Sequence, residues 1–381
     1  MKYWPLFFLY ASINFSCKPK AAKLQKAPTV LKGDFSFRKL STQEKDGYLQ
    51  QVTGFYNKVL KPNHLNGSML VAKNGEIIYE LYEGVSNFAT KEPITANTAF
   101  HIASISKTFT SAAVLRLWEQ NKLSLEDSVQ KFFPSFPYHN ITIKLLLTHR
   151  SGLPKYEYFM DTAWHENRKA SNNDLLQFMI AKQPLLYAQP NRTYLYCNTN
   201  YALLALIMEK ITGQDFPQYI KDSLFVPLGM NNTYVFSTKD TLNYKPSYMY
   251  NNAPCKLENL DCIYGDKNVY STPRDLLIWD KALYEGSFVS KAALEMAFMP
   301  YSNERKSVHN YGMGWHLFID KDDKVVYHNG WWHGNNSAFT RFIKDTATVI
   351  VLSNRYNRSV YWSGKMGPFF SGKNKEHQLE E

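Results

Sequence analysis

The sequence predicts an α/β protein of the α+β type, in which one antiparallel sheet is built from strands near both ends of the chain and is flanked by helices. Two observations lead to this fold class. Short β-like apolar runs occur near both ends of the chain, whereas between them apolar residues recur at helical spacing. We therefore expect a mainly helical subdomain inserted into the sheet domain, with a cleft where the two meet.

The strands of the expected sheet fall into two groups. The first is a hairpin of Ser68–Lys73 and Glu76–Tyr82, because the Asn-Gly pair between them is the strongest short hairpin signal. The second group lies near the end of the chain, has its last turn at 344–346, and consists of Val325–His328, Ser337–Ile343 and Ala347–Leu352. We expect the two groups to form a single sheet.

Five segments between the strand groups carry the helical pattern. Two of them end at a glycine, Gly213 and Gly286, which favours a helix C-terminus at that point. The expected helices are Ser106–Gln120, Ile143–Leu147, Asn173–Ala181, Thr199–Thr212 and Pro273–Tyr284.

The composition is that of a globular protein and argues against several function classes. The chain has 381 residues, of which 44% are hydrophobic and 20% charged, enough to bury a full core. Its formal net charge of +11 includes six lysines and no acid in residues 1–33, and the remaining +5 is dispersed, so we expect no nucleic-acid binding. The sequence has no Cys/His cluster with zinc spacing and no glycine-rich phosphate loop, so we expect no metal and no cofactor.

The N-terminus predicts export. A short basic start precedes the apolar run Leu6–Phe15, which is too short to span a bilayer and is typical of a secretory signal peptide. Ser16 before Cys17 resembles a bacterial lipoprotein cleavage site, although Asn14 stands where such sites usually carry an aliphatic residue. Two alternatives stay open: a lipid attached to Cys17, or a signal peptide removed without lipid attachment.

The other cysteines leave their redox state open. Cys255 and Cys262 flank a short loop and could pair in an oxidising compartment, but two free thiols are equally consistent with the sequence. Cys197 has no nearby partner along the chain.

Ser104-Ile-Ser-Lys107 places a nucleophile and a base on one face of a helix, because residues three apart are neighbours there. A serine hydroxyl is a weak nucleophile unless a nearby group accepts its proton, and a lysine in a desolvated cleft can do so. The spacing alone is weak evidence, since Ser128-Val-Gln-Lys131 repeats it on what we expect to be a solvated amphipathic turn. Ser104 therefore needs partners elsewhere in the chain.

Two further segments supply candidate partners. Tyr196 and Asn198 precede the apolar helix expected from Thr199, so we place them on a loop held by rigid packing. The segment His328-Asn-Gly-Trp lies on the first strand of the C-terminal group. Glycine in a strand permits close approach by a ligand, and the neighbouring N–H groups can then hold an oxyanion.

The order Ser-x-x-Lys, Tyr-x-Asn, His-x-Gly resembles the serine β-lactamase and penicillin-binding-protein superfamily, in particular its branch of class C β-lactamases, DD-peptidases and esterases. Three more segments are similar to those of the family: Leu145–Leu153, Tyr270–Leu277 and Tyr311–Trp315. The resemblance runs from about residue 50 to residue 355. It implies the β-lactamase/transpeptidase-like fold, which agrees with the fold class expected from the strand and helix pattern.

The resemblance also implies the catalytic residues. Ser104 would be the acylated nucleophile, Lys107 would lower its effective pKa, and Tyr196 would relay the proton as general base. A phenol with an ordinary pKa near 10 needs cations beside it for that role, and Lys107 with His328 would supply the field.

The implied substrate-binding residues are Asn198, His328, Gly330 and Trp331. Asn198 would hold the substrate carbonyl or amide, and the backbone N–H groups of Ser104 and Trp331 would form the oxyanion hole. His328 replaces the lysine typical of β-lactamases and transpeptidases, which weakens the anchor for a substrate carboxylate. Glu157 and Glu166 are expected to be surface charges rather than a deacylating base.

We therefore expect an exported serine hydrolase that forms an acyl-enzyme on Ser104 with an ester or amide, as an esterase, a D-amino-acid peptidase or a β-lactamase-like enzyme. Its partner would be a small-molecule or peptide substrate, with peptidoglycan-derived compounds among the candidates. The alternative is a non-catalytic cell-envelope binding or sensor protein of the same fold. Membrane contact would occur only through a lipid at Cys17, and the protein would be periplasmic or a membrane-anchored lipoprotein.

The expected division of the chain has four parts. Residues 1–17 are the signal peptide and 18–45 a flexible tail. Residues 46–355 are the β-lactamase-like domain, and 356–381 are an irregular C-terminal extension.

Overall fold

The computed structural model describes residue 1, residues 35–243, 245–321 and 323–372, and residue 379. The expected signal peptide, Cys17 and most of the expected tail lie outside these ranges. No helix in the described part is long and apolar enough to cross a membrane.

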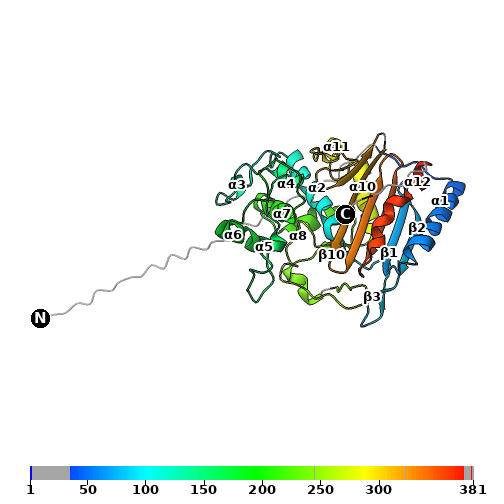
Figure 1. Ribbon diagram of the computed structural model, residues 1–381, viewed down its shortest axis with the longest axis horizontal. Coiled ribbons are helices and arrows are strands. Elements are labelled where there is room, and N and C mark those ends of the chain that lie inside the picture. The colour runs from blue at the N-terminus through cyan, green and yellow to red at the C-terminus, as the bar shows by residue number, and fades with distance from the viewer. Residues whose placement is uncertain (2–34, 244, 322, 373–378, 380–381) are drawn as a thin grey trace.

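A seven-stranded antiparallel sheet with the strand order β2-β1-β12-β11-β10-β9-β8 organises the protein (Figure 1). Its strands are β1 (Gly67–Lys73), β2 (Glu76–Glu83), β8 (His309–Tyr311), β9 (His316–Asp320), β10 (Asp323–Trp332), β11 (Asn335–Phe342) and β12 (Ala347–Ser353). β1 pairs directly with β12, with Met69 opposite Val351. The prediction of one sheet built from both ends of the chain is confirmed.

Helices cover both faces of the sheet, because its central strands are apolar on both sides. In β1, Leu70 and Ala72 pack into the core beneath α2 and α10, while Met69 and Val71 pack into the core beneath α1. Figure 1 shows α1 and α12 together on one side of the strands. The covering helices are α2 (Ser106–Glu119) and α10 (Pro273–Glu285) on one face and, on the other, α1 (Thr42–Phe55), its continuation η1 (Tyr56–Leu60), η5 (Arg358–Met366) and α12 (Gly367–Ser371).

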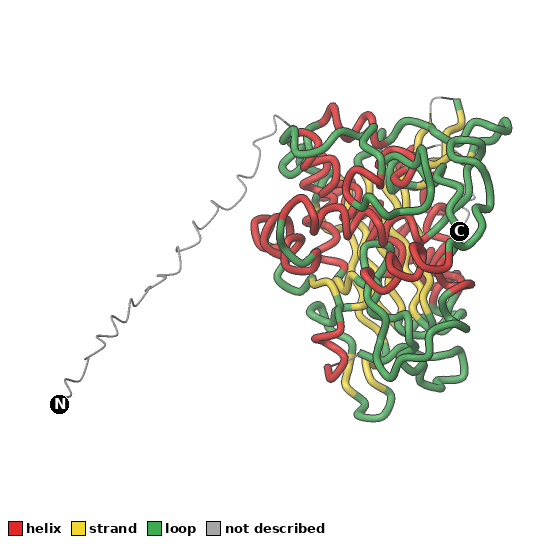
Figure 2. The backbone as a smooth tube through the Cα atoms, turned by 90° about the vertical axis from the view of Figure 1, so that its left-hand side faces the viewer, coloured by secondary structure: helices red, strands yellow, loops and turns green. Residues whose placement is uncertain are grey.

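The helical subdomain is inserted between β2 and β8 and lies in front of the strands in Figure 2. Its central helix is α7, which is buried along Thr199–Met208 and ends at Gly213 with a left-handed φ of 69°. The five expected helices all occur, each within one residue of the expected bounds. The helices between β2 and β8 whose bounds have not been given are α3 (Val129–Phe132), α4 (Ile143–Leu147), α5 (Tyr156–Phe159), α6 (Asn172–Lys182), α7 (Asn198–Thr212), α8 (Phe216–Ile220), η3 (Lys221–Phe225), α9 (Val226–Leu228), η4 (Thr238–Asn243) and α11 (Lys291–Ala297); the short turn η2 is described with the site.

A small sheet outside the main sheet lies next to the segment that leads to Ser104. Phe100 pairs with Ser271, which places the segment before Ser104 beside the segment that follows Asp266. This small sheet has the order β5-β7-β6 and consists of β5 (Phe100–His101), β6 (Tyr234–Val235) and β7 (Val269–Ser271). A separate two-stranded sheet consists of β3 (Val85–Asn87) and β4 (Glu92–Pro93).

Both ends of the domain differ from expectation. α1 begins at Thr42, inside the expected tail 18–45, because Ser41 and Glu44 form a capping box at its N-terminus. The segment from 356 was expected to be irregular, but η5 and α12 form there because apolar side chains such as Val360 are buried against the sheet. The overall limits of the domain, 46–355, stay a prediction.

Candidate active site

Ser104 lies in the single turn η2 (Ala103–Ile105) that leads into α2. The residue before it, Ala103, has a left-handed φ of 49°, which typically costs a non-glycine residue about 1 kcal/mol. His101 holds this conformation, since its Nδ1 accepts the Ala103 N–H at 3.1 Å. Burial lowers the pKa of His101 to about 4, so the ring is neutral and its Nε2–H donates to Asn268.

Lys107 connects the nucleophile to the helical subdomain. Its Nζ lies 3.0 Å from Ser104 Oγ and 2.8 Å from both Asn198 Oδ1 and the backbone oxygen of Asp266. The side chain is fully buried. Burial lowers the pKa of Lys107 to about 8, against the opposing attraction of the carboxylates of Asp266 and Glu157. The expectation of a partly neutral lysine beside Ser104 agrees with this geometry.

Tyr196 lies against Lys107, with 4.9 Å between the Lys107 Nζ and the ring centroid. Burial raises the pKa of Tyr196 well above 10, although a hydrogen bond with Ser104 opposes the shift. Its other neighbours include the rings of His149, His316 and His328, at centroid distances of 4.3, 5.9 and 6.4 Å.

These three histidines add no positive charge near neutral pH. Burial lowers the pKa of His149 and His328 well below 6.5 and that of His316 to about 3. The expectation that His328 supports Tyr196 with a positive field is therefore wrong. The reason is that His328 is enclosed: its Nδ1–H donates to Asn329 O at 2.7 Å and its Nε2 lies 3.3 Å from the Tyr311 hydroxyl.

Gly330 allows β10 to pass close to the nucleophile. A Cβ at this position would lie 2.3 Å from Ile102 O and from Ser337 Oγ, and 3.0 Å from the Ala103 Cβ. The sequence predicted close approach by a ligand; in the structure the residues that approach Gly330 are the chain's own. Trp331, the next residue, is 60% exposed at the cleft.

Glu157 is the main residue that sequence reasoning missed. It was expected on the surface, but its Oε1 accepts the Asn198 Nδ2–H at 2.6 Å, and its Oε2 is buried without a hydrogen-bond partner among the described residues. Burial raises the pKa of Glu157. Glu157 lies on α5, directly after the fully buried Tyr156, and no sequence pattern signalled its burial. Glu166 is exposed, as expected.

A cleft of about 620 Å³ lies between the sheet and the helical subdomain, where the sequence predicts one, and the predicted site residues other than Lys107 line it. Lys107 does not line the cleft; it is buried next to Ser104, which does. The C-terminal segment contributes Tyr361, whose hydroxyl donates to Gly330 O at 2.9 Å. The lining residues are Ser104, Lys155, Glu157, Tyr158, Tyr194, Tyr196, Asn198, Glu258, His316, His328, Asn329, Gly330, Trp331, Trp332, His333 and Tyr361.

The other candidate features of the sequence lie elsewhere. In the second Ser-x-x-Lys, Ser128 caps α3 and Lys131 pairs with Asp127 at 2.8 Å on the surface, as expected. Cys255 and Cys262 are free thiols in the structure. No group of three or more His, Cys, Asp or Glu side chains in the described ranges is placed to hold a metal ion.

Comparisons with known proteins agree with this geometry. A family model described as Beta-lactamase matches residues 57–362. Penicillin-binding protein 4* of Bacillus subtilis (strain 168) is 34% identical over 336 residues, covering 84% of this chain and 74% of that protein. Protein flp of Staphylococcus aureus (strain MW2) is 27% identical over 322 residues, covering 80% of this chain and 63% of that protein.

Solved structures share the fold. The octameric penicillin-binding protein homologue from Pyrococcus abyssi superposes with a TM-score of 0.69 at 26% identity, over 81% of this chain and 73% of that one. D-amino acid amidase from Ochrobactrum anthropi SV3, complexed with D-phenylalanine, superposes with a TM-score of 0.65 at 22% identity, over 82% of this chain and 92% of that one. The chain therefore belongs to the β-lactamase family of serine hydrolases.

Proposed function

We propose that the chain is an exported hydrolase that forms an acyl-enzyme on Ser104 with an amide or ester substrate. The observation that carries the proposal is the contact of 3.0 Å between the buried Lys107 Nζ and the Oγ of Ser104, which lines the cleft. With a pKa of about 8, about one Lys107 in ten is neutral at pH 7 and can accept the serine proton.

The proposed reaction uses Lys107 as the base. Lys107 takes the hydroxyl proton as Ser104 Oγ bonds to the substrate carbonyl carbon, and the backbone N–H groups of Ser104 and Trp331 hold the resulting oxyanion. When the carbon–nitrogen or carbon–oxygen bond breaks, Tyr196 passes the proton to the leaving group and regains one from Lys107. The raised pKa keeps Tyr196 protonated, so it can pass on its proton only as it regains one from Lys107, and it does not serve as the base that the resemblance implied. Water then attacks the acyl carbon, Lys107 passes a proton of that water to Ser104 Oγ as the carbon–Oγ bond breaks, and the acid is released.

We propose that the acyl part of the substrate carries an ammonium group, as in an amino acid amide. Glu157 supports this assignment, because its buried Oε2 has no partner among the described residues and can accept a hydrogen bond from a cation. The neutral His328 offers no charge to a substrate carboxylate. The fold likeness to D-amino acid amidase, solved with D-phenylalanine, adds support for amides of D-amino acids.

Mass spectrometry of the intact protein tests the acyl-enzyme. Incubation with D-phenylalanine amide, a p-nitrophenyl ester and a penicillin should add an acyl mass to the wild type and none to Ser104→Ala. Saturable binding of these compounds that survives Ser104→Ala, with no adduct and no turnover, would support the non-catalytic binding or sensor protein instead.

Matched substrates test the ammonium site. Glu157→Gln keeps an acceptor for Asn198 but loses the charge, so kcat/KM for D-phenylalanine amide should fall about 10- to 100-fold. The rate for 3-phenylpropionamide, which lacks the amino group, should change less than about threefold. Glu258→Gln, a second acid of the cleft, is the control variant. Equal losses on both substrates would refute the assignment.

Export and the choice between periplasm and membrane anchor belong to the same proposal. The expected signal at 1–17 predicts processing before or at Cys17. Labelling with a fatty-acid analogue, compared between wild type and Cys17→Ala, separates a lipoprotein from a protein released without lipid, and an unprocessed product in the cytoplasm would refute export.

A further inference from the structure

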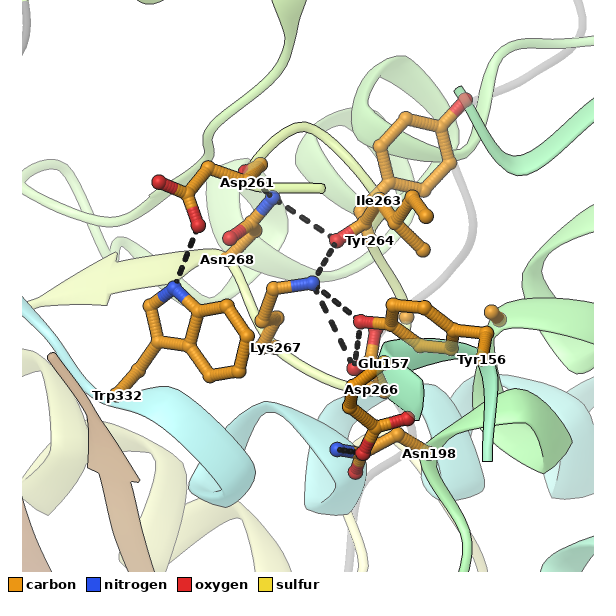
Figure 3. A network of polar contacts seen from close by, with 12 residues as sticks. Tyr156, Glu157, Asn198, Asp261, Ile263, Tyr264, Asp266, Lys267, Asn268 and Trp332 are labelled. Atoms are coloured by element: carbon orange, nitrogen blue, oxygen red, sulfur yellow. Dashed lines mark hydrogen bonds and ion pairs between the residues drawn. The ribbon is translucent and has the colours of Figure 1, made fainter. Parts of the chain in front are cut away.

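Tyr156, Asp266 and Lys267 form a buried polar cluster (Figure 3). It is joined to Lys107 through the backbone oxygen of Asp266. The Tyr156 hydroxyl donates to Asp266 Oδ2 at 2.9 Å and accepts a hydrogen bond from Lys267 Nζ at 2.5 Å. Lys267 Nζ also donates to Ile263 O at 2.9 Å and lies 3.7 Å from Asp266 Oδ2. The side chains of Asp266 and Lys267 are 0% and 3% exposed, so an opposite charge pair is enclosed in the protein.

The cluster is attached to the catalytic lysine by the backbone. Lys107 Nζ donates to the carbonyl oxygen of Asp266 at 2.8 Å, so the residue that carries the buried carboxylate also fixes the position of the ammonium group. Asp266 Oδ1 has no hydrogen-bond partner among the described residues. A carboxylate with one oxygen left unsatisfied is poorly optimised for stability alone.

The other side of the cluster packs against a wall of the cleft. Lys267 Nζ lies 4.7 Å from the ring centroid of Trp332, which lines the cleft. The Trp332 Nε1–H donates to Asp261 Oδ1 at 2.8 Å, and Asp261 also pairs with His333 at 3.0 Å. The charge pair therefore lies between the lysine beside the nucleophile and one wall of the cleft.

We propose that Asp266 and Lys267 are positioning residues that set the proton affinity of Lys107 with opposite signs, while Tyr156 keeps the two charges apart at a fixed distance. This inference rests on the proposed function of Lys107 as the base. Asp266 stabilises the protonated form of Lys107 and Lys267 destabilises it, so the pair tunes the fraction of neutral lysine at working pH.

Other titratable and polar groups also face Lys107. The pair acts beside the Glu157 carboxylate on α5, Asn198 and Tyr201 on α7, and Cys197 before it. His149, His316 and His328 are neutral near pH 7, because burial lowers the pKa of each. Tyr196 and Tyr201 are neutral because burial raises their pKa values. Burial raises the pKa of Cys197 to about 12, so this thiol is neutral as well. Among the groups named here, Glu157, Asp266 and Lys267 are the charged ones that act on Lys107.

The test is the pH dependence of Ser104 phosphonylation by a p-nitrophenyl phosphonate, which reports the nucleophile without a known substrate. Asp266→Asn should move the acid limb of the profile down by about one pH unit, because the protonated lysine loses a stabilising charge. Lys267→Gln should move it up by a similar amount. Lys267→Arg, which keeps the charge, should restore the wild-type limb.

Asp280→Asn provides the matched control. It breaks another buried pair, with Arg341, on α10 and β11, so it should reduce stability without moving the limb. Shifts of Asp266→Asn and Lys267→Gln in the same direction, or no shift in folded protein, would overturn the inference. Should either single variant fail to fold, Asp266→Asn combined with Lys267→Gln leaves no buried charge unpaired. Its limb should stay within about half a unit of wild type, and a larger shift would overturn the inference.

The two proposals fail in different ways. A wild-type protein that is not phosphonylated at Ser104 would refute the proposed function. A phosphonylated wild type whose variants keep an unshifted limb would refute only the role of Asp266 and Lys267.

Discussion

Gly330→Ala tests whether β10 can pack closely against the turn that carries Ser104 only because glycine has no Cβ. An added Cβ would lie 2.3 Å from both Ile102 O and Ser337 Oγ. Ile102 cannot easily yield, because its N–H donates to Val269 O at 2.9 Å and its own oxygen accepts the Ser337 hydroxyl at 2.7 Å. We therefore expect the strand to retreat by about 1 Å, since normal contacts between such atoms begin beyond about 3 Å.

This displacement should lower both the stability of the protein and its acylation rate. Overpacking of this kind costs about 1–3 kcal/mol of unfolding free energy. A shift of about 1 Å in the N–H of Trp331 relative to Ser104 should lower the acylation rate about 100-fold, because the oxyanion hole no longer matches the transition state. Urea denaturation measures the first effect, and stopped-flow acylation by a chromogenic ester measures the second.

Gly54→Ala is the control for the same substitution. Gly54 lies in α1, where an added Cβ meets nothing within 4 Å, and alanine is the better helix former by about 1 kcal/mol. This variant should be slightly more stable and acylate at the wild-type rate. A Gly330→Ala protein with wild-type stability and an acylation rate within about threefold would refute the proposed reason for the glycine.

Three further variants test other parts of the site and core. In the wild type, acylation should rise with pH through about 8 as Lys107 loses its proton, whereas Lys107→Arg stays protonated and should acylate at least about 100-fold more slowly throughout; a normal profile for the variant would contradict the base role. Asp280→Asn should lose about 3–5 kcal/mol in urea denaturation, because it leaves the buried Arg341 unpaired; a loss below about 1 kcal/mol would contradict the pairing. Tyr361→Phe removes a hydroxyl bonded to Gly330 O and should lower stability by about 1 kcal/mol, and an unchanged melting curve would argue against that bond.

The main elements of the fold could be predicted because their signals are local. The Asn-Gly turn fixes the first hairpin, and the glycines after α7 and α10 end those helices with left-handed φ values of 69° and 70°. The C-terminal helical segment could not be predicted, because Val360 and Tyr361 become ordered only by packing on a sheet whose strands come from distant parts of the chain. Such non-local burial leaves no helical period to read.

Part of the site could likewise be predicted from the sequence, and part could not. Ser104, Lys107, Tyr196 and Asn198 could be named from motif order, and the structure brings them together. The charge state of their surroundings could not be predicted, because it depends on enclosure. His328 looks like an ordinary titrating histidine in the sequence, yet burial lowers its pKa well below 6.5 and keeps it neutral near pH 7.

Enclosure also changes which residue can do the chemistry. A buried phenol becomes a weaker acid and a buried ammonium a stronger one, so the same apolar surroundings raise the pKa of Tyr196 and lower that of Lys107 to about 8. The two shifts act together to leave the proton on the phenol and to free the amine. His328 is neutral and has no part in this balance. The carboxylates of Glu157 and Asp266 oppose the loss of the proton from Lys107, because they stabilise its charged form. It follows that neutralising either carboxylate should make Lys107 a more available base, but only the loss of Glu157 should alter which substrates are accepted.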